Sequence, residues 1–143
     1  MNKEKAPPDR LRWLVKNWAV PVGCGLLFLF LLKIIFFVGY VPSSSMEPAI
    51  KQGSFIFGVR LFSEPERGDV VVFMRENLLM VKRIAGVPGD DVHAGGQTLT
   101  VPSGYYFVLG DNEESSVDSR LWDEPFVGQD RIIAKIVIPR QRP

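Results

Sequence analysis

Three serines stand between two prolines in residues 42–48, which read Pro-Ser-Ser-Ser-Met-Glu-Pro. A serine hydroxyl becomes a strong nucleophile only when a neighbouring base accepts its proton. Without such a base, a segment rich in serine and proline is usually a turn or a linker. The segment is therefore a candidate nucleophile, with Ser45 directly before Met46, only if the fold brings a base to it.

Lys82 is the candidate base, and it lies in residues 80–84, Met-Val-Lys-Arg-Ile. This is an apolar strand pattern, and alternate side chains of a strand face opposite ways. Lys82 then shares the more apolar face with Met80 and Ile84. Burial disfavours the ammonium form and lowers the pKa of a lysine, so Lys82 could act as a neutral base. A lysine whose ammonium reaches solvent along its alkyl chain is the commoner alternative.

Two more segments carry charged residues next to apolar strands. Residues 67–73, Arg-Gly-Asp-Val-Val-Val-Phe, form a turn that enters a strand expected to be buried. Residues 110–120, Gly-Asp-Asn-Glu-Glu-Ser-Ser-Val-Asp-Ser-Arg, form a polar loop in which Asp118 could contact Arg120. Taken alone, each segment indicates only a loop or a turn.

Together and in this order, the four segments resemble the boxes of type I signal peptidases, the membrane-anchored leader peptidases that use a Ser–Lys pair. The family boxes read Pro-Ser-x-Ser-Met-x-Pro, Arg-Gly-Asp-Val, Lys-Arg-x-x-Gly-x-Pro-Gly-Asp and Gly-Asp-Asn followed by Ser-x-Asp-Ser-Arg. The third box is residues 82–90 here, and residues 101–112 resemble the lead into the last one. The resemblance runs from about Gly39 to Ala134.

This resemblance implies a serine endopeptidase that forms an acyl-enzyme. Ser45 would be the nucleophile, and Lys82 would be the general base that later activates water. The oxyanion hole would consist of the Ser45 backbone N–H and the Ser43 hydroxyl. Three more residues would orient the lysine or brace the site from behind: Ser116, Asp118 and Arg120.

The chain also departs from the family pattern. Bacterial members usually have Arg after Gly-Asp-Asn, whereas Glu113 and Glu114 follow here. Ala49-Ile50 replaces the usual Thr-Leu. Only 20 residues separate Asp90 from Asp111, where larger members insert a second β-domain. The resemblance thus implies a minimal catalytic core in which contacts around Glu113 differ from the usual ones.

An apolar segment precedes the boxes and is expected to anchor the chain in a membrane. Residues 18–38 contain one charge, Lys33, and a helix of roughly 20 residues crosses a bilayer. Residues 1–17 carry five basic and two acidic side chains, so the positive-inside rule places them in the cytoplasm. Residues 39–143 would then be the exported catalytic domain, on the outer face of a bacterial cell membrane. A removed secretory signal is the alternative, although such apolar regions are shorter.

The exported part is expected to be mainly β. Short runs rich in β-branched and aromatic residues alternate with Gly, Pro and Asp. Strands are predicted at residues 35–41, 54–59, 69–74, 78–85, 97–101, 105–109 and 132–138. This pattern favours a small coiled or closed antiparallel sheet of the signal-peptidase type, without the large inserted second β-domain.

Several other functions are disfavoured by the residues present. The exported part holds no basic stripe for a nucleic acid. One histidine and one cysteine, Cys24 inside the apolar segment, do not suffice for a usual metal site, and we expect no metal and no cofactor. A Ser-His-Asp triad would have to use His93, which lies in a Gly-rich turn.

The residues also allow other functions, both within the signal peptidase family and outside it. The expected partners are the lipid bilayer and preprotein signal peptides with small residues before the scissile bond. A specialised peptidase that processes pilins in conjugation fits the chain nearly as well. A non-catalytic anchored paralogue is compatible with Glu113 and Glu114. Self-cleaving repressors with a related Ser–Lys core are disfavoured, because the chain carries an apolar segment where they carry a DNA-binding domain.

Overall fold

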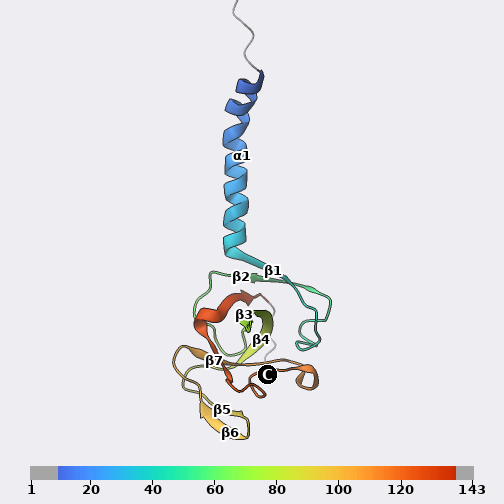
Figure 1. Cartoon of the computed structure of the whole chain (residues 1–143), viewed down its shortest axis with the longest axis vertical. Helices are drawn as coiled ribbons and strands as arrows, with labels where there is room; N and C mark the ends of the chain where they lie inside the picture. The colour runs from blue at the N-terminus through green and yellow to red at the C-terminus, as the bar shows by residue number, and fades with distance from the viewer. Residues whose placement is uncertain (1–9, 138–143) are drawn as a thin grey trace, which may run out of the picture. The chain divides into compact units, whose positions relative to one another are not determined.

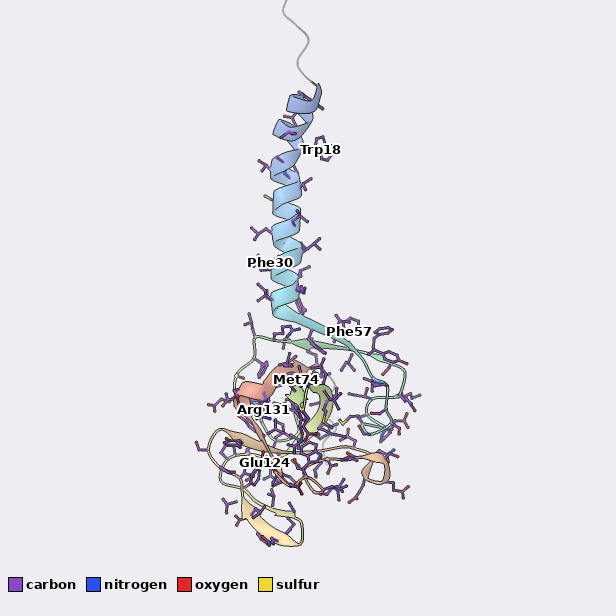
Figure 2. The ribbon with its side chains drawn as sticks, in the orientation of Figure 1. Trp18, Phe30, Phe57, Met74, Glu124 and Arg131 are labelled. Carbon is purple, nitrogen blue, oxygen red and sulfur yellow. The ribbon has the colours of Figure 1, made fainter. Side chains whose placement is uncertain are left out.

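The computed structural model describes residues 10–137 and divides the chain into two compact units, Met1–Ile34 and Ile35–Pro143 (Figure 1). Helix α1, Arg10–Ile35, contains the whole described part of the first unit, and its last residue begins the second. Its residues Asn17–Ile35 have a mean hydropathy of 2.2 and suffice in length and composition to cross a membrane. Figure 2 shows Trp18 and Phe30 projecting from α1, and both side chains are exposed.

The predicted membrane segment and the helix differ at one end. Phe36, Phe37 and Val38, which the sequence places in the apolar segment, begin the first strand instead. β-branched and aromatic residues suit a strand as well as a helix in a membrane, so hydropathy alone does not mark this boundary. The basic residues before Arg10 and the end of the expected last strand, Ile138, lie outside the described residues.

The second unit is built on a sheet of seven strands with the order β1-β2-β9-β3-β4-β7-β8. Every neighbouring pair is antiparallel. The strands are β1 Phe36–Tyr40, β2 Phe55–Val59, β3 Val70–Arg75, β4 Leu78–Gly86, β7 Tyr105–Leu109, β8 Phe126–Gly128 and β9 Ile132–Ile136. Strands β5 Asp91–Ala94 and β6 Gln97–Thr100 form a separate two-stranded sheet. Two short 3-10 helices complete the unit, η1 Glu113–Ser115 and η2 Gln129–Arg131.

The large sheet is open, because its order begins with β1 and ends with β8. The mainly β, antiparallel fold predicted from the sequence is confirmed, and the sheet is not closed. Register shifts interrupt the β3–β9 pairing between Val72 and Phe73 and the β4–β7 pairing between Ile84 and Gly86. Such irregularities bend strands and increase their twist.

Strand β3 is buried on both faces and joins two hydrophobic clusters. Val70 and Val72 pack into one cluster with residues of β1, β2 and β9, while Val71 and Phe73 pack into another with β4 and β7. Strand β4 runs beside it after a tight turn at Glu76 and Asn77, both of which have positive φ, at 49° and 63°. Such turns match the twist of a hairpin. The turn fixes β4, and therefore Lys82, in register with the most buried strand of the sheet.

Two strands were not predicted from the sequence. β5 contains His93, which we expect in a turn, and the turn itself lies two residues later, at Gly95 and Gly96. β8 has only three residues, too few for a recognisable alternation. Both lie away from Ser45 and Lys82 in sequence, so these misses do not affect the placement of the predicted site.

Candidate active site

The loop between β1 and β2 carries the serines and is anchored by its apolar residues. Met46 and Ile50 are 1% and 5% exposed and pack into the first hydrophobic cluster. Backbone hydrogen bonds close the loop: the Val41 N–H donates to the Ser54 carbonyl, and the Gly53 N–H donates to the Val41 carbonyl. The buried Met46 side chain anchors the loop in the core and thereby fixes the position of Ser45, the residue before it.

Ser45 is 8% exposed, and its hydroxyl lies 3.4 Å from the hydroxyl of Ser43. The two side chains to which the family resemblance assigns the roles of nucleophile and oxyanion-hole donor are therefore neighbours in space. Both line a cavity of about 470 Å³. The rest of its wall comes mainly from β1 residues such as Tyr40 and from the first half of β4, including Leu78 and Met80.

Lys82 also lines this cavity and is 3% exposed. Met80 and Ile84, its neighbours on the same face of β4, belong to the second hydrophobic cluster, as strand alternation predicts. The Lys82 Nζ donates a hydrogen bond of 2.8 Å to the Ser116 Oγ. Burial lowers the pKa of Lys82 below its usual 10.5; the charge of Asp118 acts against this and that of Arg120 acts with it.

Ser45 and Lys82 share the cavity, but among residues 10–137 no hydrogen bond joins their side chains. The Ser45 hydroxyl is nearest to Ser43, and the Lys82 amine is held by Ser116. Catalytic hydrogen bonds are often long in a free enzyme and tighten when substrate binds. The geometry thus brings the two groups to one cavity with the amine already oriented.

Asp118 lies behind the lysine and is fully buried. It accepts hydrogen bonds from the Ser116 Oγ at 2.7 Å, from the Gly110 N–H at 3.0 Å, and from the Arg120 Nε and Nη2 at 2.9 Å each. Burial alone would raise the pKa of Asp118, but the hydrogen bonds from Arg120, Gly110 and Ser116 outweigh it and lower the pKa to about 2. Asp118 therefore stays ionised and fixes the Ser116 hydroxyl that holds Lys82.

Two residues of the last box contact the serine loop, Asn112 by hydrogen bonds and Gly110 by close packing, and the motifs assigned no role to either. The Asn112 N–H donates to the Ser45 carbonyl at 3.0 Å, and its side-chain amide donates to the Ser44 carbonyl at 3.2 Å. A Cβ on Gly110 would lie 2.1 Å from the Ser116 Oγ and 2.6 Å from the Ser45 carbonyl oxygen. Only glycine fits between the two loops. Their place in the Gly-Asp-Asn box was the one signal that could have found them.

Two other residues considered in the sequence, Glu113 and His93, lie outside the cavity. Glu113, in η1, pairs with Arg120 on the exposed side of the site. His93 is exposed, and its Nδ1 lies 3.0 Å from the Thr98 hydroxyl across the small sheet. The triad that would use His93 is not assembled among the described residues.

Comparison with known proteins places this arrangement in a family. A family model described as signal peptidase, peptidase S26, matches residues 15–101 and 93–140. Signal peptidase I of Bacillus amyloliquefaciens is 32% identical over 157 residues, which cover 84% of each chain. Probable signal peptidase I-2 of Synechocystis sp. is 28% identical over 171 residues, covering 96% of this chain and 77% of the relative.

Signal peptidase I of Pseudomonas aeruginosa is 28% identical over 160 residues, covering 63% of this chain. The match spans 56% of that longer relative, just over half of its length. In the described residues, an apolar helix precedes an antiparallel sheet in which a serine and a buried lysine line one cavity. The chain belongs to the signal peptidase family, peptidase S26.

Proposed function

We propose that this chain is a membrane-anchored endopeptidase that removes N-terminal signal peptides from preproteins. Ser45 is the nucleophile and Lys82 is the general base. The observation that carries the proposal is the cavity that Ser45 and the buried Lys82 share, with the amine held by Ser116. Relatives named signal peptidase I support the substrate class.

The chemistry proceeds in two halves. Neutral Lys82 takes the proton of the Ser45 hydroxyl as the Ser45 oxygen attacks the carbonyl carbon of the scissile peptide bond. The Ser45 N–H and the Ser43 hydroxyl donate to the oxyanion, a type of interaction that contributes about 3–4 kcal/mol per donor. Lys82 then gives its proton to the departing amine, which leaves an acyl-enzyme. In the second half Lys82 deprotonates a water that releases the signal peptide.

The behaviour of the lysine follows from its surroundings. A solvated lysine is protonated near neutral pH and cannot accept a proton. Burial lowers the pKa of Lys82, while the Asp118–Arg120 pair supplies Ser116 as a fixed acceptor for the amine. Asp118 and Arg120 therefore act as positioning residues that hold Ser116.

The membrane arrangement is part of the proposal. Residues 1–17 lie in the cytoplasm, residues 18–38 contain the anchor, and residues 39–143 form the catalytic domain on the outer face of the cell membrane. The apolar helix and the basic residues before it support this orientation. Only seven residues after Val38 the chain reaches Ser45, so a substrate anchored by its own signal segment meets the nucleophile near the bilayer.

The test is cleavage of a signal-bearing preprotein by the full chain in detergent. Wild type should cut once, at the junction between a small residue and the mature protein, and Ser45→Ala should not cut. Ser44→Ala is the matched control, because it removes a neighbouring hydroxyl without a proposed role and should remain active. Equal activity of the Ser45→Ala protein, or no cleavage by folded wild type of any of several preproteins, would overturn the proposal.

A further inference from the structure

The cavity that contains Ser45 has an apolar wall and a polar end. Strands β1 and β4 form most of the wall, and the contribution of β4 ends at Lys82. Ser115 and Val117 complete the wall, one on each side of the Ser116 whose hydroxyl accepts the hydrogen bond from Lys82. Among the described residues of the wall, Lys82 is the only lysine, arginine, aspartate or glutamate. Any further charge that acts on a substrate at this end comes from residues next to Ser115.

Glu114 precedes Ser115 in η1, and both ends of this segment are fixed to the site. At one end the Asn112 N–H donates to the Ser45 carbonyl at 3.0 Å, and the Ser115 N–H donates to the Asn112 carbonyl at 3.2 Å. At the other end the Ser116 hydroxyl is buried and bonded on two sides. Glu114 itself is exposed. Because consecutive Cα atoms are about 3.8 Å apart, the backbone of Glu114 lies next to the cavity wall.

The segment around Glu114 carries an excess of negative charge. Arg120 forms ion pairs with both Glu113 and Asp118. Glu114 forms no ion pair with any described residue. Residues 113–120 thus hold three carboxylates and one guanidinium, which gives a net charge of −2. At physiological salt a charge acts over about 8 Å, far enough to reach a peptide that lies in the cavity.

The two sides of a scissile bond differ in polarity, and so do the two parts of the cavity. A signal segment is apolar and precedes the bond. It matches the apolar wall, to which Val38 of β1 and Met80 of β4 belong. With the bond at Ser45 and Lys82, the residues that follow it leave the cavity at the polar end. The first residues of the mature protein therefore pass Glu114.

We propose that Glu114 is a specificity residue: it favours preproteins with a lysine or an arginine among the first few residues of the mature protein. The net negative charge of residues 113–120 attracts a cation at these positions and repels a carboxylate. Because the charges are exposed to solvent, the attraction is modest and acts on the choice among substrates. The inference rests on the proposed function and names the class of substrate that the site prefers.

The experiment compares peptides that span one cleavage junction and differ in a single residue after the scissile bond. Each of the first few mature positions carries lysine, glutamine or glutamate in turn, and kcat/KM is measured with the full chain in detergent at low salt. We expect wild type to prefer lysine over glutamate by about three- to tenfold at the most sensitive position, with glutamine between them. Added salt should bring this ratio towards one.

Charge variants at position 114 assign the preference to this residue. Glu114→Gln should lose most of the preference for the lysine peptide, and Glu114→Lys should reverse it. Glu64→Gln is the matched control, because it removes the same charge from an exposed residue that lines a different cavity, and its preference should equal that of wild type. The ratio between two peptides does not depend on the amount of folded enzyme, so partial unfolding of a variant does not imitate a lost preference.

A lysine-to-glutamate ratio that is the same in wild type and in Glu114→Gln would overturn the proposal, as would a preference confined to positions before the scissile bond. Failure of the proposed function has a different signature, because wild type then cleaves none of the peptides. Binding of the same peptides to the Ser45→Ala protein, measured by fluorescence anisotropy, gives the preference without turnover. Equal affinities of that protein for the lysine and glutamate peptides would also contradict a role of Glu114 in specificity.

Discussion

Lys82 and Arg83 are neighbours in β4 but lie in opposite electrostatic surroundings. The Lys82 amine is buried and bonded to a neutral hydroxyl, that of Ser116. The Arg83 guanidinium donates to both oxygens of Asp111, at 2.7 and 2.6 Å, and to the Gly68 carbonyl at 2.8 Å. On the Lys82 side of the strand the cationic group bonds to no carboxylate, whereas on the Arg83 side it bonds to Asp111.

The difference has opposite effects on the two pKa values. Burial lowers the pKa of Lys82, whereas the hydrogen bonds with Asp111 raise that of Arg83. Asp118 is near Lys82, but Arg120 binds both of its oxygens and opposes its charge. A strand can thus present a base and a permanent cation at consecutive positions. This requires that the carboxylate on one face, Asp111, bonds to the strand's own cation, and that the carboxylate on the other face, Asp118, bonds to Arg120 instead.

The largest expected effect is the loss of activity when Lys82 is replaced. Lys82→Met keeps an unbranched apolar side chain but removes the base, and Ser45 and Lys82 act as a unit. We expect cleavage of a preprotein to fall by about 10⁴-fold or more. Lys51→Met, on the exposed part of the serine loop, is the matched control and should change little. Activity of the Lys82→Met protein within about tenfold of wild type would exclude Lys82 as the base.

The pH dependence should report Lys82 and not Arg83. Only the neutral amine can accept a proton, so kcat/KM should fall about tenfold per pH unit below the pKa of Lys82. Because that pKa is lowered from 10.5, the plateau should be reached at a less alkaline pH than a solvated lysine allows. The check is a series of initial rates from neutral to alkaline pH. An acid optimum would contradict the assignment.

A smaller effect is expected from the hydroxyl that holds the amine. Ser116→Ala removes the acceptor for Lys82 and should lower kcat by about 10- to 100-fold, because a misplaced base reacts slowly. Ser115→Ala, which deletes the neighbouring exposed hydroxyl in η1, should stay close to wild type. Ser116→Thr keeps a hydroxyl and should recover part of the rate. Equal losses in the two alanine variants would show that the loop, and not the hydrogen bond, matters.

Stability should change in opposite directions at the two positions. Arg83→Met leaves Asp111 without its partner and should lower the free energy of unfolding by about 1–3 kcal/mol. Lys82→Met removes a buried amine and should raise it. The pKa of Lys82 is lower in the folded than in the unfolded chain, so the unfolded chain binds the extra proton. The contribution of Lys82 to wild-type stability therefore rises between its lowered pKa in the folded chain and about 10.5.

Thermal unfolding in detergent at two pH values tests this pair. The gain of the Lys82→Met protein over wild type should be largest near neutral pH and shrink as the pH approaches 10.5. A Lys82→Met protein that is less stable than wild type at neutral pH would mean that burial of the Lys82 amine does not lower the free energy of unfolding. Comparable losses in both variants would remove the contrast between the two faces of β4.

The sequence predicted these faces because strand alternation is a local property. Seven expected strands match β1–β4, β6, β7 and β9 to within a residue or two in their described parts. The two strands it missed, β5 and β8, are short, and their residues read equally well as turns. Lys82 was placed correctly with Met80 and Ile84, since a period of two decides the face.

Only the site residues that stand in recognisable motifs could be predicted from the sequence. The boxes gave Ser43, Ser45, Lys82, Ser116, Asp118 and Arg120, and the structure brings these residues around one cavity or directly behind it. The bonds from Asn112 to the serine loop join residues 68 positions apart. Contacts over such a separation depend on the order of strands in the sheet, which no local pattern in one sequence determines. The same limit applied to Glu113, whose partner could not be read from the sequence.

The smallest effect is expected at Glu113, where the chain departs from its family. Its carboxylate pairs with Arg120 but is 81% exposed, and exposed ion pairs are worth about 0–1 kcal/mol. Arg120 keeps both bonds to Asp118 without it, so Ser116 and Lys82 should remain in place. Glu113→Gln should therefore alter kcat/KM by less than about threefold at low salt and not at all at high salt. Glu64→Gln, which removes the same charge from an exposed residue outside the cavity, is the control. A tenfold loss for Glu113→Gln alone, persisting in salt, would mean that the hydrogen-bonded Ser116, Asp118 and Arg120 behind Lys82 also depend on Glu113 at the surface.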